Sequence, residues 1–189
     1  MAAIGFRVHT GWAACVVLEG QPGRLKVLLR RRLELLPKND SPPRFLFHSA
    51  AELGPDKAAD LVESARLAVH QHVRLALQEL LQTTPAIECA GIPVGSKEVP
   101  QKLAAILASH PLIHSAEGAF YQQAVADACT HHNLPVFTAR EKAVWLECAP
   151  KMQEELTALR TSVGPPWGED QRIAAAAALF ALKSYSIAG

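Results

Sequence analysis

The chain has 189 residues, with 19 Lys and Arg against 18 Asp and Glu and a formal net charge of +1. Its 49% of apolar residues suffice for one sizeable core, and this length predicts a single domain spanning residues 1–189. This balance excludes a mainly disordered chain, because disorder combines low hydrophobicity with high net charge. It also argues against a wholly basic nucleic-acid binder.

Charge and apolar residues are unevenly distributed along the chain. Up to Phe47 there are eight basic and three acidic residues, a balance of +5, so the remainder carries −4. No apolar run is long enough for a membrane span, and the start lacks the features of a signal peptide. We therefore predict a soluble cytoplasmic protein without a membrane partner. The four cysteines show no Cys-x-x-Cys spacing, which predicts small buried hydrophobic side chains: Cys15, Cys89, Cys129 and Cys148.

The first third of the chain is predicted to form strands. Ile4–His9 and the apolar run Trp12–Glu19 precede turn chemistry at residues 21–23. From Leu25 to Leu35 the odd positions are apolar except Arg31, which is the period of a half-buried strand. A proline-containing loop over residues 37–43 is expected to follow.

Helices and strands are predicted to alternate after this loop. Alanine and leucine are abundant, with 32 and 24 residues, and both favour helix. The expected elements are a long helix opened by Gly54-Pro55-Asp56 and ending before Pro85, a strand Ile87–Pro93, a short helix Lys102–Ala108, a helix Leu112–His132, a strand Leu134–Thr138, a helix Arg140–Arg160 interrupted at Pro150, and an alanine-rich helix Asp170–Ser184.

This order predicts an α/β fold with a mixed five-stranded sheet, antiparallel in its first three strands and then parallel, with helices on both faces. The order resembles the ribonuclease H-like fold. The segment His114–Thr138 resembles a helix and strand of the resolvase-like branch, which cuts Holliday junctions. Residues 169–180, two acids before an alanine-rich stretch, resemble that branch's last helix. If the protein is an enzyme, the resemblance implies a Mg²⁺- or Mn²⁺-dependent nuclease.

The resemblance assigns catalytic roles to carboxylates, because two metal ions must stabilise the attacking and leaving oxygens of the phosphodiester. The candidates are Glu88, Glu117, Glu169 and Asp170, with Glu117 and Asp170 as metal ligands. The aspartate that the family carries on its first strand is missing, and Arg7 or Val8 stands there. Because a cation cannot bind a metal ion, the sequence indicates an incomplete two-metal site.

Each acidic residue also has a simpler interpretation. Glu88 can be a solvated charge at a strand end, and Glu169 and Asp170 suit any helix start. Glu117 shares a helical stripe with Ile113 that should face the sheet, so it must be paired, protonated or bound to a cation. A salt bridge to Arg7 or Arg31 is one solution. With the family geometry, Glu88, Glu117 and Asp170 would surround a mixed-charge pocket near Arg7 and His9.

Two further groups of side chains attract attention. His110, His114 and Glu117 follow the i, i+4, i+7 spacing of metal ligands on one helix face, although Pro111 is expected to start the helix and leave His110 outside as a cap. Arg7, Arg30 and Arg32 in the basic first third are candidates for nucleic-acid binding.

Three functions follow from these patterns. The first is a divergent ribonuclease H-like protein with an incomplete metal site and an association with DNA or RNA. The second is an active nuclease that uses Glu88, Glu117, Glu169 and Asp170. The third is a non-enzymatic interaction module or homodimer, in which the alanine-rich last helix packs against a partner or a second copy.

Overall fold

The computed structural model of the chain describes residues 1–37, 42–84, 86–146 and 148–188. Five strands form one sheet in the order β3-β2-β1-β4-β5. The first three pair antiparallel, whereas β4 runs parallel to β1 and β5 parallel to β4. The strands are β1 (Ala2–His9), β2 (Trp12–Glu19), β3 (Lys26–Glu34), β4 (Cys89–Val94) and β5 (Val136–Arg140). The predicted mixed five-stranded sheet is confirmed.

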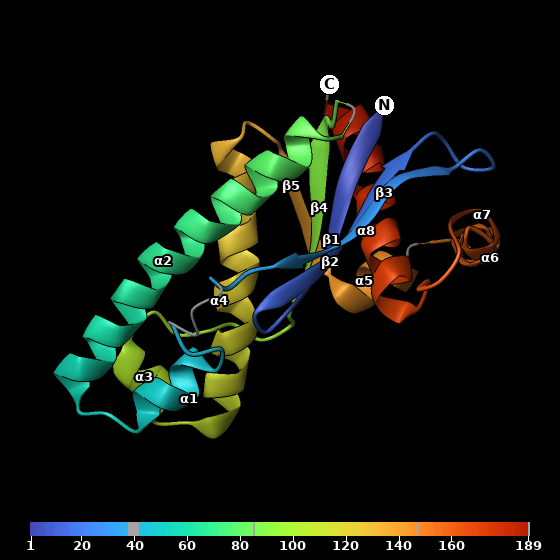
Figure 1. The fold of residues 1–189 in the computed structure, drawn as a ribbon. Helices are drawn as coiled ribbons and strands as arrows, with labels where there is room; N and C mark the ends of the chain where they lie inside the picture. Colours follow the sequence, from blue (N-terminus) through green and yellow to red (C-terminus); the bar gives the residue numbers. More distant parts are fainter. Residues whose placement is uncertain (38–41, 85, 147, 189) are drawn as a thin grey trace.

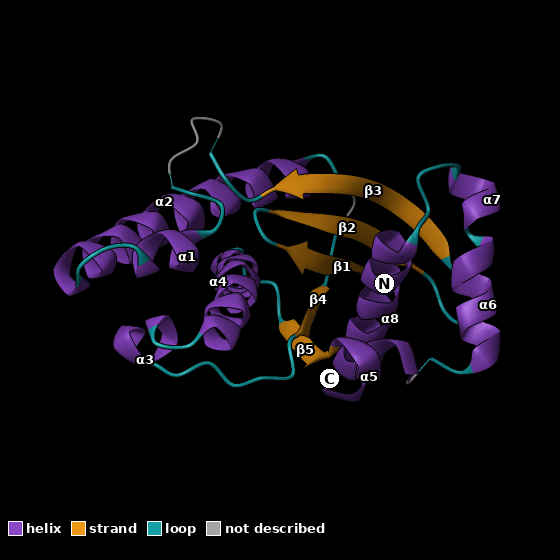
Figure 2. Ribbon diagram, turned by 90° about the horizontal axis from the view of Figure 1, so that it is seen from below, coloured by secondary structure: helices purple, strands orange, loops and turns teal. Residues whose placement is uncertain are grey.

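Helices cover both faces of the sheet (Figure 2). α2 (Pro55–Gln82) and α4 (His110–His131) lie on one face, and α8 (Glu169–Ala188) lies on the other. In Figure 1 the lower parts of α2 and α4 extend past the sheet together with α1 and α3. The shorter helices are α1 (Leu46–Ala51), α3 (Leu103–Leu107), α5 (Glu141–Leu146), α6 (Pro150–Ala158) and α7 (Arg160–Val163).

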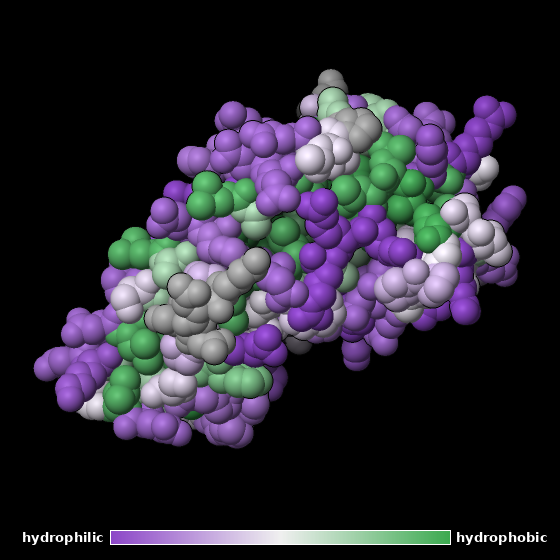
Figure 3. Space-filling view, in the orientation of Figure 1, coloured by the Kyte–Doolittle hydropathy of each residue, from purple (hydrophilic) through white to green (hydrophobic). Residues whose placement is uncertain are grey.

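Two apolar cores lie on either side of the sheet, because successive strand residues point to opposite faces. Alternate β1 residues such as Ile4 and Phe6 pack against α2 and α4, whereas Ala3 packs against α8. On the face seen in Figure 3, hydrophilic side chains are interspersed with separate apolar patches. None of the described helices is long and apolar enough to cross a membrane.

α8 packs very closely on the sheet through its alanine-rich stretch. Residues 174–178 are five consecutive alanines with no exposed surface. They lie against Gly5 of β1 and Gly91 of β4, where an added Cβ would come within 3.0 Å of the α8 backbone. The predicted use of these alanines for a partner or second copy is therefore wrong, because they cover the protein's own sheet.

The apolar face predicted over residues 25–35 is divided by a bulge. The register between β2 and β3 shifts at Val17 and Leu18, which pair with Leu29 and Val27. Leu25 and Val27 consequently pack in the core beside α8, and Leu29 in the core beside α2 and α4. One extra residue in a strand reverses which positions face each side.

Helix boundaries differ from the predictions in three places. α1 was not predicted, and the helix expected over 140–160 is divided into α5, α6 and α7. α4 begins at His110, with Pro111 in its first turn, so His110 belongs to the helix and is not a cap outside it. The loop predicted over residues 37–43 lies largely outside the described residues.

The four cysteines are buried, as predicted. Burial raises the pKa of Cys15 to about 12 and that of Cys129 to about 12. Burial also raises the pKa of Cys89 to about 11, to which the nearby Glu88 contributes. Because the thiolate is the reactive form, these three thiols are expected to be inert packing groups.

His70 of α2 makes stability depend on pH. Burial is the main cause, and it lowers the pKa of His70. Asp127 on α4, whose Oδ2 lies 3.2 Å from Nδ1 of His70, raises this pKa but does not outweigh burial. Among the smaller effects, the charges of Arg66 and Arg74 lower the pKa further and that of Glu63 raises it. The unfolded chain therefore binds the proton more readily than the folded one below about pH 6.5. The neutral His70 side chain therefore stabilises the folded protein above about pH 6.5. This contribution is lost as the pH falls through the lowered pKa of His70 in the folded protein.

Melting temperatures between pH 7.5 and 5 test this. We expect the decrease on acidification to be smaller in His70→Gln than in the natural protein. His72→Gln, which changes a half-buried histidine on the same helix, is the control. Equal slopes in His70→Gln and the natural protein would contradict the assignment.

Candidate functional site

Arg7 lies near the end of β1, and its guanidinium is surrounded by three carboxylates. Nη1 lies 2.9 Å from Oδ1 of Asp170, and Nη2 lies 3.0 Å from Oε1 of Glu141 and 3.1 Å from Oε1 of Glu169. The Arg7 side chain is only 15% exposed. Its location follows from the topology. β4 lies between β1 and β5 and runs parallel to both, so the carboxyl ends of these three strands meet at the same end of the sheet. We call these four residues the Arg7 cluster.

Electrostatics keep this arginine charged. Burial alone would lower its pKa, but the hydrogen bond and charge of Glu141 and the charges of Glu169 and Asp170 raise it overall. One guanidinium faces three carboxylates, so the cluster carries excess negative charge if all three are ionised. Glu169 and Asp170 also lie in the first turn of α8, where the helix dipole favours negative charge.

A layer of rings and a second guanidinium lies beside the cluster. His9 places Nε2 2.8 Å from Oδ1 of Asp170, and its ring stacks on Trp12 with centroids 4.3 Å apart. Cζ of Arg32 lies 3.9 Å from the centroid of the Trp12 ring. The strand register puts Arg7, Ala14 and Arg32 in one row across the sheet. His9, Trp12 and Glu34 form the row two residues further along, which lies on the same face. Arg32, His9 and Trp12 thus form a partly exposed surface, which we call the Trp12 surface.

The predicted acidic residues do not all meet. Glu169 and Asp170 join the Arg7 cluster, but Glu88 precedes β4 beside Ala2, at the opposite end of the sheet, about five strand residues or roughly 16 Å from Arg7. The Glu88 carboxylate lies 4.0 Å from the Met1 amino group.

Glu117 is buried, as its helical spacing indicates, but its contacts go to α1. Its carboxylate accepts hydrogen bonds from the backbone N–H groups of Leu46, Phe47 and His48 at 3.1, 2.8 and 3.2 Å. Nδ1 of His48 lies 3.1 Å from Oε1. The predicted salt bridge with Arg7 or Arg31 is therefore replaced by backbone amides at the start of a helix, which a carboxylate satisfies. Glu117 does not meet Asp170, because α4 and α8 cover opposite faces.

The arginines of β3 also have internal partners. Arg30 donates to the carbonyl oxygens of Gly164, Pro165 and Pro166 at 2.7, 3.1 and 2.6 Å, which holds the loop before α8. Arg32 pairs with Glu34 at 2.5 Å but stays exposed beside Trp12. Of the arginines proposed to bind nucleic acid, Arg32 is therefore the most accessible, since Arg7 is enclosed by carboxylates.

Solved structures with the same arrangement clarify the fold. RuvC of T. thermophilus in complex with a Holliday junction substrate aligns over 100% of this chain and 96% of its own, with a TM-score of 0.58 and 15% identity. A second structure of Thermus thermophilus RuvC gives a TM-score of 0.55, 16% identity and coverage of 100% and 97%. The chain has a ribonuclease H-like fold. No protein-family model and no curated protein sequence matches it.

A metal ion at the Arg7 cluster would have to compete with the guanidinium. The Arg7 cluster holds a guanidinium between the carboxylates, and a fixed cation there repels a second one. Oε1 of Glu141 and Oδ1 of Asp170 are each within hydrogen-bonding distance of Arg7, and Oδ1 of Asp170 also of His9, so an ion would compete with these contacts. No buried side-chain nitrogen or oxygen atom among the described residues lacks a hydrogen-bond partner that an ion could supply.

Glu141 was missed in the sequence, although a signal for it exists. It follows β5 directly, and an acidic residue after a parallel strand lies at the edge where the other strands of that direction end. His48 was missed because α1 was not predicted.

Proposed function

We propose that this chain is a non-catalytic ribonuclease H-like protein that binds nucleic acid through the Trp12 surface. One observation carries the proposal: the guanidinium of Arg7 lies within 3.1 Å of Glu141, Glu169 and Asp170, where the resemblance calls for metal ions. An arginine can neutralise these carboxylates, but it cannot activate a water molecule or bind a leaving oxygen as a divalent ion does.

The nucleic-acid part rests on the chemistry of the neighbouring surface. Bases of any sequence can stack on aromatic rings, and arginine side chains attract phosphates. Trp12, His9 and Arg32 offer both on one sheet face. The likeness to RuvC, which was solved with a Holliday junction substrate, supports a four-way DNA junction as the first probe.

Binding is tested by mobility shift of a labelled four-way junction at roughly 50 mM salt. His9 and Arg32 contact the Trp12 ring, so a base would stack on it by displacing the exposed Arg32 side chain, which is then available to a phosphate. Loss of stacking on one base is worth about 1–3 kcal/mol, so Trp12→Ala is expected to weaken binding about tenfold. Arg32→Ala should weaken it as well and reduce its salt dependence. Arg66→Ala is the matched control, because Arg66 also forms an exposed ion pair with a nearby glutamate, but on α2. Absence of a shift, or equal loss in Arg66→Ala, would reject the surface.

Cleavage is tested separately with the same junction and Mg²⁺ or Mn²⁺. We expect no product from the natural protein. Arg7→Asp, which replaces the cation by a carboxylate, is expected to gain stabilisation by millimolar Mg²⁺ that the natural protein lacks. Junction cleavage that Asp170→Asn abolishes would establish the competing function, an active nuclease.

A homodimer is a further proposal, and a solution mass near 20.4 kDa would exclude it.

A further inference from the structure

Three histidines from two helices meet on the side of the sheet away from the Arg7 cluster. His48 comes from α1, and His110 and His114 come from the first two turns of α4. One ring nitrogen from each lies within 4.8 Å of those from the other two. We propose that His48, His110 and His114 bind one divalent transition-metal ion of the Zn²⁺ type.

The spacing of the nitrogens suits such an ion. Two imidazole nitrogens bound to tetrahedral zinc at about 2.0–2.1 Å lie roughly 3.3 Å apart. Here Nε2 of His110 and Nε2 of His114 are 3.0 Å apart. The ring centroid of His48 lies 5.4 Å from that of His110 and 4.8 Å from that of His114. We expect rotation of the two exposed α4 side chains to bring the three nitrogens closer together when an ion binds.

Glu117 orients His48 for this role. Oε1 of Glu117 accepts hydrogen bonds from the backbone N–H groups of Phe47 and His48. Because this oxygen is an acceptor, Nδ1 of His48 donates the proton across their 3.1 Å contact. In a neutral ring Nε2 then carries the free lone pair. A carboxylate that bonds the remote nitrogen of a ligating histidine is the usual support of zinc sites. Glu117 is buried and held by α1, so it is a positioning residue for His48.

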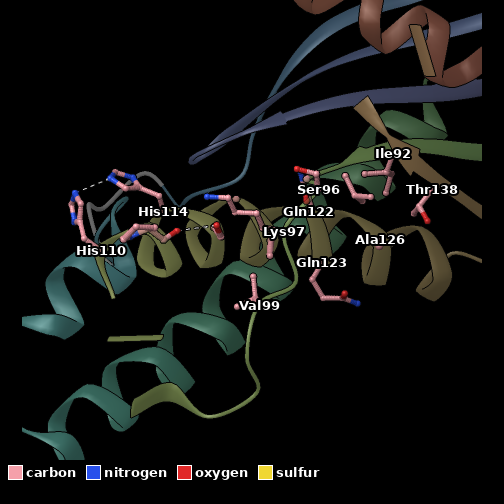
Figure 4. A pocket seen from close by; sticks show the side chains of 16 residues that line it. Ile92, Ser96, Lys97, Val99, His110, His114, Gln122, Gln123, Ala126 and Thr138 are labelled. Atoms are coloured by element: carbon pink, nitrogen blue, oxygen red, sulfur yellow. Dashed lines mark hydrogen bonds between the residues drawn. The ribbon is translucent and has the colours of Figure 1, made fainter. Parts of the chain in front are cut away.

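His110 and His114 line a cavity of about 770 Å³. Figure 4 shows His110 and His114 at one end of it, with Ile92, Ala126 and Thr138 at the other end and Lys97 between them. Three histidines leave a fourth position of a tetrahedral ion for water or another small ligand. An ion bordering this cavity would be accessible from solvent. The ring nitrogens suit Zn²⁺, Cu²⁺ or Ni²⁺ better than Mg²⁺, so this site differs in chemistry from a carboxylate-held nuclease centre.

Isothermal titration of the chelator-treated full chain with ZnCl₂ tests the proposal. We expect one equivalent to bind, and His114→Ala to weaken the affinity at least 100-fold. Because His114 is exposed, this variant should keep the circular dichroism spectrum of the natural protein. His131→Ala, which removes an exposed histidine from the other end of α4, is the matched control and should bind as the natural protein does.

Glu117→Gln tests the positioning role, and about a tenfold weaker zinc affinity is expected. Substitution by Co²⁺ provides a readout that a structural defect alone would not produce, because loss of His48 from the coordination shell changes the visible absorption of the bound ion. The proposal is overturned if no equivalent binds, or if His114→Ala and His131→Ala lower the affinity equally. The first result would mean a hydrogen-bonded histidine pair only, and the second would mean scattered surface binding.

Discussion

Gly5→Ala is expected to destabilise the protein by at least about 3 kcal/mol, a large share of the total stability of a typical domain. The added Cβ would meet the carbonyl oxygen of Ala174 and the backbone nitrogen of Ala178 far inside 3.0 Å. Backbone atoms cannot rotate away as the end of a side chain can, so α8 would have to leave the sheet. Urea unfolding monitored by circular dichroism measures the loss.

Gly118→Ala is the matched control for Gly5→Ala. Gly118 lies inside α4, and nothing stands within 4 Å of an added Cβ. Alanine is the better helix former, so this variant is expected to be more stable by about 0.5–1 kcal/mol. If Gly5→Ala were as stable as Gly118→Ala, this would show that α8 does not lie as close to β1 as described.

Arg7→Leu is expected to cost about 2–3 kcal/mol. It removes the cation that neutralises Glu141, Glu169 and Asp170 and leaves their charges to repel one another at the start of α5 and α8. Removal of one partner from a buried ion pair costs about 3–5 kcal/mol, and the partial exposure of these carboxylates reduces that figure. The midpoint of urea unfolding, at constant denaturant dependence, measures the change.

Two further variants separate charge from geometry at this position. Arg7→Lys keeps the charge but loses the planar fork that contacts three carboxylates at once, so an intermediate loss is expected. Arg66→Leu removes an exposed arginine paired with Glu63 and should change stability little. Equal stability of Arg7→Leu and the natural protein would show that the cluster is held by other contacts.

Much of the fold could be predicted from the sequence because long elements repeat their pattern many times. β2 was predicted at its observed bounds, and α2 within a few residues, since both combine a sustained apolar period with clear turn or proline signals. α1 has six residues, less than two turns, which is too short for a period to be recognised. The bulge between β2 and β3 depends on pairing and left no pattern in one strand alone.

The sites were predicted less completely because partners depend on packing. Helical spacing correctly indicated that Glu117 is buried, but not that α1 covers it. The basic residue on β1 indicated an incomplete metal site, yet the third carboxylate around Arg7 came from Glu141, which the spacing of its own helix did not single out. His110 and His114 attracted attention at i and i+4, whereas their companion His48 lies 62 residues before His110 in the chain.

The contact between the first strand and the last described helix has a consequence for biosynthesis. Arg7 and Asp170 are separated by 163 positions in the chain. During synthesis from the N-terminus, β1 and its neighbours must wait with one apolar face uncovered until α8 has emerged. Truncation before residue 169 would leave this face uncovered permanently, so we expect the truncated chain to be found in the insoluble fraction after expression.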